Sequence, residues 1–104
     1  MVTEWTTEEV ADRLARGEKL NLIDVRERDE WQAGHIPAAR LIPMSELAGR
    51  LDELEREEGE PLVFICRSGA RSGRVCEYLA QQGYNVVNVA GGMLAWEGDV
   101  ETGA

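Results

Sequence analysis

The sequence predicts an α/β fold: a central parallel sheet of about five short strands, flanked by helices on both faces. Short apolar segments alternate along the chain with segments of helical periodicity, the order expected of a parallel sheet. The clearest strand is the uninterrupted apolar run at residues 62–65, which suits a strand buried on both faces. With 104 residues, the chain is expected to form a single domain, 1–104, around one core.

The first helix is predicted to begin at Thr6 or Thr7, because Thr6 and Glu9 have the Thr-x-x-Glu spacing of a capping box. Gly17 would end it in a left-handed conformation. The elements predicted next are a strand at 20–25, a short helix at 27–33 with Trp31 turned inward, and a brief strand at 40–42.

A further helix is predicted to be capped by Ser45. Leu47, Leu51 and Leu54 recur at helical spacing and would form a stripe facing the core. The charged run 52–60 is interpreted as the solvated end of this helix and the loop that follows it.

The last third of the chain is predicted to contain two strands and two helices. These are a strand from Pro61 to Cys66, a helix at about 71–82 ended by Gly83, a strand at 86–89 and a short apolar helix after Gly91 and Gly92. The helix at 71–82 would bury Val75, Cys76, Leu79 and Ala80. Residues 97–104 are expected to form a loose C-terminal tail.

The charge balance excludes some classes of partner. The chain has 11 basic and 20 acidic residues, a net charge of −9, which argues against nucleic acid and against an anionic membrane surface. Apolar runs fall short of the roughly 18 residues that span a bilayer, and residues 1–20 lack a signal-peptide pattern. Two cysteines do not make a disulfide framework, so we expect a cytoplasmic protein with reduced thiols. We expect a monomer or a weak dimer.

Cys66 is predicted to be a reactive thiolate. It ends an apolar strand and precedes a helix, which places it at the carboxyl edge of the sheet, where ligands bind in such folds. The helix amino terminus, the small residues of a loop with Gly69 at its centre, and the charges of Arg67 and Arg71 all favour an anion there. The simpler alternative is an inert buried thiol at a strand end.

Four motifs in order make the chain resemble a single-domain rhodanese, a sulfurtransferase homology domain. The matching segments are 22–27 (LIDVRE), 34–39 (GHIPAA), 66–72 (CRSGARS) and a final group at 83–84 (GY), 88–89 (NV) and 91–96 (GGMLAW). Together they cover nearly the whole length, and their spacing also matches. Ala38 stands where the family usually has glycine.

The resemblance implies a thiosulfate sulfurtransferase that works by a ping-pong reaction through a Cys66 persulfide. The donor would be thiosulfate, a small anion, and the acceptor would be cyanide in vitro and a cellular thiol or protein in vivo. Cys66 would be the catalytic residue, and the donor-binding residues would be Arg67, Ser68, Gly69, Ala70, Arg71 and Ser72. No metal and no cofactor is expected. The alternative is a persulfide carrier or regulatory module that a partner protein loads.

Loop length separates sulfur transfer from phosphoryl transfer. Cysteine-based phosphatases place five residues between the cysteine and the arginine, whereas four lie between Cys66 and Arg71. The shorter loop favours sulfur chemistry, and its two arginines favour thiosulfate over mercaptopyruvate as the donor. An inactive binding domain is a further alternative, against which the intact Cys66 argues.

Other polar residues have both a structural and a functional interpretation. Asp24 and Arg26 could orient the loop or form a structural ion pair, and His35 could donate a proton or stabilise a turn. Cys76 is expected about two turns down the helix from the loop, and we interpret it as a core residue. Arg74 would add positive potential or be merely exposed.

Overall fold

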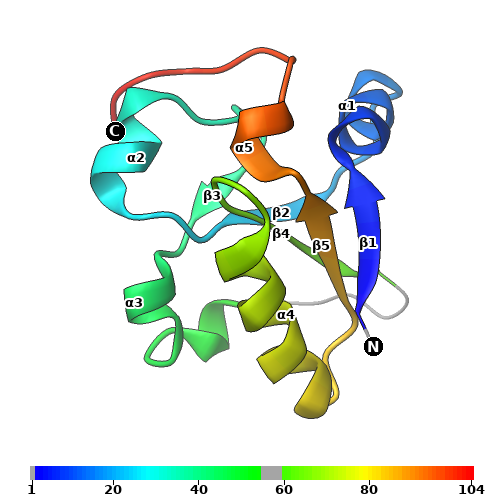
Figure 1. Cartoon of the computed structure of the whole chain (residues 1–104), viewed down its shortest axis with the longest axis vertical. Coiled ribbons are helices and arrows are strands. Elements are labelled where there is room, and N and C mark those ends of the chain that lie inside the picture. The colour runs from blue at the N-terminus through cyan, green and yellow to red at the C-terminus, as the bar shows by residue number, and fades with distance from the viewer. Residues whose placement is uncertain (1, 55–59) are drawn as a thin grey trace.

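The structure, a computed structural model, describes residues 2–54 and 60–104. Its centre is a five-stranded parallel sheet in the order β1-β5-β4-β2-β3 (Figure 1), which confirms the predicted fold class. The strands are β1 (Thr3–Thr6), β2 (Asn21–Asp24), β3 (Arg40–Leu41), β4 (Leu62–Ile65) and β5 (Val86–Ala90). The helices are α1 (Thr7–Ala15), α2 (Arg28–Ala33), α3 (Met44–Leu47), the 3₁₀ helix η1 (Leu51–Glu53), α4 (Ala70–Gln81) and α5 (Gly92–Ala95).

Two hydrophobic cores lie on the two faces of the sheet. Along β4, Leu62 and Phe64 pack into one core, and Val63 and Ile65 pack into the other, as the alternation of side chains along a strand requires. The first core is closed by α3, η1 and α4, and the second by α1 and the segment around α5. Strand β4 is central, with β2 and β5 on either side, so the chain after β4 emerges between the ends of both neighbours.

The strand β1 has no counterpart among the elements located from the sequence. It is an edge strand that pairs only with β5, and Trp5 is its one half-buried side chain. An edge strand of this kind carries little of the apolar signal by which buried strands are found. The capping box of α1 is confirmed: Thr6 accepts a hydrogen bond from the backbone of Glu9, and the Glu9 carboxylate accepts from the backbone of Thr6.

The helix expected at Ser45 is wrong in its start and in its length. Pro43 is the N-cap, Ser45 lies inside α3, and its hydroxyl donates to the Glu27 carboxylate at 2.9 Å. The helix ends after one turn, before Gly49, because glycine in a helix interior is unfavourable. The chain resumes as η1, so the leucine stripe spans two short helices.

The stripe itself faces the core as predicted. Leu47 and Leu54 are buried, and Leu51 packs against them. Of the charged run 52–60, residues 55–59 lie outside the described residues.

The helix after the Cys66 segment matches its prediction closely. It ends at Gln81, and Gly83 follows with a positive φ of 89°, as expected of a helix stop. Its buried face differs from the prediction at two residues: Ser72 is buried beside Val75, Cys76 and Leu79, whereas Ala80 is only partly covered.

The C-terminal segment 97–104 has no helix or strand, but it is held against α2. Glu101 forms an antiparallel bridge with His35, with N–H to O distances of 2.9 Å and 2.8 Å, and Gly103 donates to the carbonyl of Gln32 at 2.8 Å. These bonds tie the tail to the protein, so it is less loose than we expected. Among the described residues, no helix combines the length and apolar character needed to cross a bilayer.

Candidate active site

Cys66 and the six residues that follow it, here called the Cys66 loop (66–72), connect β4 to α4 at the carboxyl edge of the sheet (Figure 1). The loop turns at Gly69, which has a φ of 98° and caps α4. A Cβ atom at this position would lie 3.3 Å from the backbone nitrogen of Gly91. Conformation and close approach therefore both favour glycine at the turn.

The Cys66 sulfur accepts hydrogen bonds from its own loop. The backbone N–H of Gly69 lies 3.1 Å from Sγ, and the hydroxyl of Ser72 lies 3.2 Å from it. Both donors come from the turn and the first helical turn of α4, where backbone N–H groups lack partners within the helix. The predicted arrangement of inward-facing donors around the sulfur is therefore present.

These hydrogen bonds determine the ionisation of the thiol. Burial raises the pKa of Cys66, but the hydroxyl of Ser72 and the N–H groups of Ser72, Gly69 and Ser68 donate to the sulfur and outweigh it. The net effect lowers the pKa of Cys66 below its ordinary value. The thiolate, which is the nucleophilic form of cysteine, is thus favoured at this position.

Asn88 is a member of the site to which the sequence assigned no role. Its Oδ1 atom lies 2.6 Å from the hydroxyl of Ser72, while its Nδ2 atom donates to the carbonyl of Gly69 and to the carboxylate of Glu4. Because the Ser72 hydroxyl has one proton, Asn88 and the Cys66 sulfur compete for it. Asn88 thus links β5 to both residues that donate to Cys66.

Arg71 lies beside the loop, but its charge is compensated. Its guanidinium makes two hydrogen bonds to the carboxylate of Glu30, at 2.7 Å and 2.8 Å. The hydrogen bonds from Arg71 lower the pKa of Glu30 to about 2, so both groups are charged at neutral pH. Glu30 comes from α2, and no local pattern in the sequence indicated this pairing.

The other arginine of the loop, Arg67, is exposed and has no ion-pair partner among the residues that the structure describes. Ser68 and Ala70 are also exposed, whereas the Cys66 side chain is 0% exposed beneath them. Among the described residues, Arg67 is therefore the arginine of the loop that no carboxylate compensates.

The amino end of α5 holds the start of the Cys66 loop. The N–H of Met93 donates to the carbonyl of Cys66 at 2.8 Å, and the N–H of Leu94 donates to that of Arg67 at 2.9 Å. A Cβ atom on Gly92 would lie 2.4 Å from the carbonyl oxygen of Cys66. Gly92, the first residue of α5, thus permits a close contact with the backbone of Cys66.

Asp24 and Arg26 form a buried ion pair, with 2.8 Å between Arg26 Nη2 and Asp24 Oδ2. Arg26 also donates to the backbone carbonyls of Gly34 and Glu30, at 2.8 Å and 3.3 Å. These contacts join the end of β2 to both ends of α2, which favours the structural interpretation of the pair. They also help to position the helix that carries Glu30.

His35 stabilises the turn after α2. Its Nδ1 atom lies 2.7 Å from the carbonyl oxygen of Trp31, and the two rings stack with 3.6 Å between their centroids. Its backbone forms the bridge to Glu101. The half-buried Trp31 thus packs on His35.

Cys76 is a free, fully buried thiol in the core between α4 and the sheet. Burial raises its pKa to about 12, which keeps it protonated. The core interpretation of Cys76 is confirmed. Within the described ranges, no group of three His, Cys, Asp or Glu side chains is arranged to hold a metal ion.

Comparison with known proteins identifies the family of the chain. The family model described as the rhodanese-like domain matches residues 6–99. The chain belongs to this family. This rhodanese-like domain is 43% identical to the protein YtwF of Bacillus subtilis, over 96% of this chain and 95% of that one. It is 42% identical to a sulfurtransferase of Allochromatium vinosum, over 92% of this chain and 89% of that one.

Solved structures agree with the family assignment. The crystal structure of a rhodanese-like domain protein from Staphylococcus aureus superposes with a TM-score of 0.87 and 36% sequence identity. The alignment covers 99% of this chain and 100% of that one. The resemblance seen in the four sequence motifs is therefore confirmed in the whole fold.

Proposed function

We propose that this rhodanese-like domain is a sulfurtransferase that carries the transferred sulfur as a persulfide on Cys66. The observation that supports this most directly is the pair of hydrogen bonds from Gly69 N–H and the Ser72 hydroxyl to Sγ. They favour a thiolate, and they would equally stabilise the negative charge of a persulfide. The similarity to the sulfurtransferase of Allochromatium vinosum, which aligns over most of both chains, supports the same reaction class.

The proposed reaction has two steps. In the first, the Cys66 thiolate attacks the outer sulfur of thiosulfate, an S–S bond forms to Cys66, and the S–S bond of thiosulfate breaks as sulfite leaves with the electron pair. In the second, an acceptor attacks the outer sulfur of the persulfide, and Cys66 leaves as a thiolate. The lowered pKa of Cys66 favours the thiolate, and a thiolate needs no general base to remove a proton in the first step.

Access to the sulfur requires a local movement. Because Cys66 is 0% exposed, the exposed residues of the loop, Arg67, Ser68 and Ala70, must move aside for the sulfur donor to reach Sγ. The same residues would then border the bound anion, with Arg67 as the free charge. Thiosulfate as donor is further supported by a relative named thiosulfate sulfurtransferase, from Pseudoalteromonas translucida, which is 32% identical over 77% of this chain.

The ion pair between Arg71 and Glu30 favours a second candidate function. It removes one of the two positive charges that the sequence offers to a dianionic donor. A loop in which Arg71 is paired and Arg67 has no carboxylate partner among the described residues is less selective for thiosulfate, and it suits a donor such as a persulfide on a partner protein. The domain would then be a persulfide carrier or regulatory module.

Steady-state kinetics distinguish these functions. Cyanide is the acceptor, and the donors compared are thiosulfate, 3-mercaptopyruvate and a small persulfide such as glutathione persulfide. The proposal predicts ping-pong kinetics and the highest kcat/KM with thiosulfate. A kcat/KM for the persulfide at least tenfold above that for thiosulfate would favour the carrier function instead. A protein that is inactive with every donor would contradict both the thiosulfate sulfurtransferase and the carrier function.

A further inference from the structure

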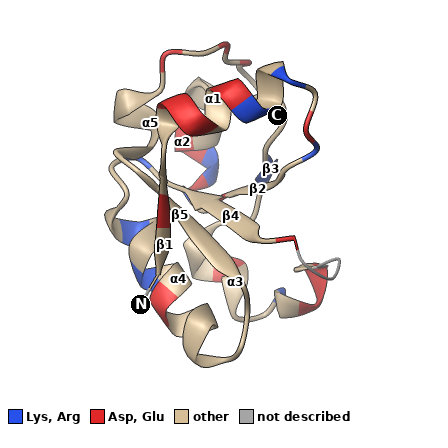
Figure 2. Ribbon diagram, turned by 90° about the vertical axis from the view of Figure 1, so that its right-hand side faces the viewer, with Lys and Arg blue, Asp and Glu red and all other residues tan. Residues whose placement is uncertain are grey.

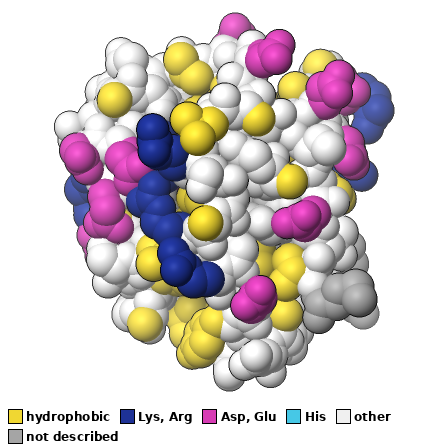
Figure 3. All heavy atoms as spheres, in the orientation of Figure 1, with side chains coloured by type: hydrophobic (Ala, Val, Ile, Leu, Met, Phe, Trp, Pro, Cys, Tyr) yellow, Lys and Arg dark blue, Asp and Glu magenta, His cyan; other side chains and the backbone are white. Residues whose placement is uncertain are grey.

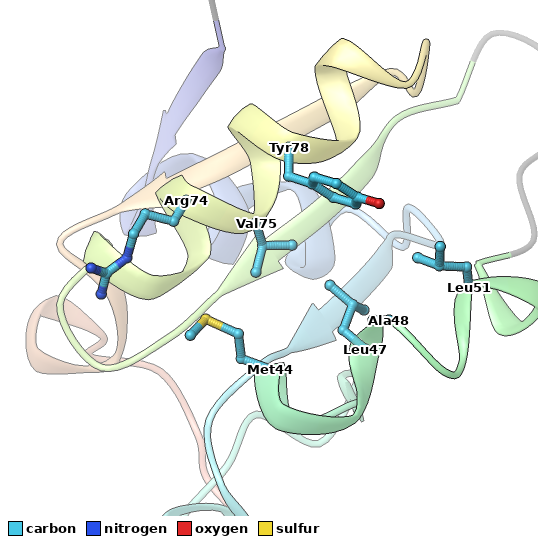
Figure 4. Close-up of a pocket in the computed structure, with 7 residues that line it drawn as sticks. All are labelled: Met44, Leu47, Ala48, Leu51, Arg74, Val75 and Tyr78. Carbon is cyan, nitrogen blue, oxygen red and sulfur yellow. The ribbon is translucent and has the colours of Figure 1, made fainter.

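An apolar groove lies between α3 and α4, close to the Cys66 loop. It encloses about 290 Å³. The residues that line it are Met44, Leu47, Ala48, Leu51, Arg74, Val75 and Tyr78 (Figure 4). Leu47 and Val75 form its floor as part of the core, whereas Met44 and Tyr78 remain 38% and 50% exposed. Exposed methionine and aromatic side chains beside a buried apolar floor are typical of surfaces that bind other proteins.

The groove begins next to the loop. Its wall on α4 is formed by Arg74, Val75 and Tyr78, and α4 itself begins at Ala70, within the Cys66 loop. Arg74 is therefore about 6 Å along the helix from Ala70, and Tyr78 is about one turn further away. Figure 4 shows Arg74 and Met44 at one end of the groove and Tyr78 and Leu51 at the other.

The positive charge at the loop end of the groove has no carboxylate partner among the described residues. Most arginines of the described chain pair with carboxylates: Arg13, Arg16, Arg26, Arg28, Arg50 and Arg71. Arg67 and Arg74, both exposed, have no such partner among the described residues, although the chain has 20 acidic residues. Figure 2 shows basic segments at the start of α4, and Figure 3 shows a band of basic side chains across the face of the molecule seen in Figure 1.

We infer that the groove and Arg74 form the docking surface for a protein that accepts sulfur from Cys66. The bound segment of this acceptor carries a carboxylate that pairs with Arg74 and a bulky apolar side chain that enters the groove between Met44 and Tyr78. This inference rests on the proposed function and names its acceptor by chemistry. A second copy of this chain is a poorer occupant, because each copy carries a net charge of −9.

The geometry limits where the accepting thiol can be. An extended segment advances about 3.3 Å per residue, so two or three residues span the distance from Arg74 to the loop. In the transfer step, the acceptor thiolate attacks the outer sulfur of the Cys66 persulfide. The new S–S bond forms on the acceptor, the S–S bond to Cys66 breaks, and Cys66 keeps the electron pair as a thiolate.

Synthetic acceptor peptides test the inference. The probe is the peptide acetyl-Cys-Gly-Asp-Gly-Phe-amide, and a second probe has the same residues in reverse order. In the matched control peptides, Asp is replaced by Lys or Phe is replaced by Ser. Cys66 is first loaded with thiosulfate, or with glutathione persulfide if thiosulfate fails, and loading is verified by intact mass. The second-order rate constant of transfer to each peptide is then measured by mass spectrometry at low ionic strength, with cyanide as the reference acceptor.

Of the two residue orders, we compare the one that reacts faster. We expect this Asp–Phe peptide to react about five- to tenfold faster than either matched peptide, and we expect the preference for Asp over Lys to fall as salt rises. Arg74→Glu should reverse the preference between the Asp and Lys peptides. Tyr78→Ala, with Met44→Ser as a second variant, should abolish the preference for Phe over Ser. Lys19→Glu is the matched control, because Lys19 is exposed and lies before β2, outside the groove.

Each contrary outcome has a distinct meaning. Equal rates for all peptides, with normal transfer to cyanide, would overturn the docking inference and leave the proposed function standing. No loading from either donor would overturn the proposed function and the inference with it. Sedimentation velocity completes the test: a dimer that Tyr78→Ala dissociates would assign the groove to contacts between copies and contradict the inference.

Discussion

At the level of single residues, the reactivity of Cys66 depends on a side chain six positions along the chain. The Ser72 hydroxyl lies 3.2 Å from Sγ, and among the hydrogen bonds that lower the pKa of Cys66 its contribution is the largest. A hydrogen bond to a charged group contributes about 1.5–3 kcal/mol, so losing it reduces the thiolate population severalfold or more. The buried position of Ser72 therefore has a chemical explanation.

Ser72→Ala is expected to raise the pKa of Cys66 and to slow persulfide loading at pH 7 by about tenfold, with the rate recovering as pH rises. The measurement is the pH dependence of loading. Ser68→Ala is the matched control, because only the backbone N–H of Ser68 acts on Cys66 and the variant keeps it. An unchanged midpoint in Ser72→Ala would show that the hydroxyl does not stabilise the thiolate.

Glu30→Gln tests the ion pair that compensates Arg71. The pKa of Glu30 is lowered from an unfolded value of 4.5 to about 2, so its stabilising effect is complete above pH 4.5 and is lost as pH falls towards 2. Glu30→Gln should reduce the free energy of unfolding by about 1 kcal/mol at pH 7, the scale of a partly exposed pair. In urea unfolding, the difference from wild type should shrink between pH 4.5 and 2. A difference independent of pH would exclude the ion pair as its cause.

At the level of elements, the Cys66 loop is held in place by α5 as well as by α4. Gly92 has a φ of 55°, and a Cβ there would meet the backbone of Cys66 and Arg67 at 2.4 Å and 2.7 Å. Both contacts are with backbone atoms, which cannot rotate away as a flexible side chain can. The start of α5, which follows the last strand, therefore helps to determine the shape of the candidate site.

Gly92→Ala should destabilise the protein by about 2–4 kcal/mol and disturb persulfide loading, because the loop backbone must shift. Gly17→Ala is a matched control: its φ is 84°, but nothing lies within 4 Å of the added Cβ, so only the backbone term of about 1 kcal/mol remains. The comparison uses urea unfolding and the loading rate. Equal losses of stability in the two variants would contradict the close contact with the Cys66 loop.

The elements that the sequence located are those with a strong local signal. Strand β4, helix α4 and the capping box of α1 each have an apolar pattern or a cap that is visible within a few residues. Strand β1 and the pair α3 and η1 lack such a signal. Strand β1 is a half-exposed edge, and Gly49 interrupts a leucine stripe that otherwise has helical spacing.

At the level of the whole molecule, the candidate site collects residues that are far apart in the sequence. Motif and spacing were enough to locate Cys66 and the backbone N–H groups that surround its sulfur, because these lie within one loop. The hydrogen bond from the Ser72 hydroxyl to Cys66 was not predicted. Motif and spacing also gave no indication that Glu30 pairs with Arg71, or that Asn88 reaches the loop from β5 and is itself bonded to Glu4 of β1. Pairings of this kind depend on which strands are neighbours, and they become visible only once the sheet is assembled.

The buried pair of Asp24 and Arg26 also connects separate parts of the fold, because it joins the end of β2 to α2. Asp24 is 0% exposed, and removing its charge leaves Arg26 buried without a counter-ion. Asp24→Asn should therefore lower the free energy of unfolding by about 3–5 kcal/mol, measured in urea at pH 7. The remaining folded protein should load Cys66 at close to the normal rate. Wild-type stability combined with a lost loading rate would instead assign the pair to the chemistry.

The mass of the intact protein after incubation with thiosulfate shows directly whether Cys66 carries a persulfide. A Cys66 persulfide adds one sulfur atom, and subsequent cyanide should remove it. We predict this adduct in wild type and in Cys76→Ala, because the Cys76 thiol of the wild type is buried and protonated, and we predict its complete loss in Cys66→Ser. An adduct that persists in Cys66→Ser, or no adduct in wild type with either thiosulfate or glutathione persulfide, would contradict this prediction.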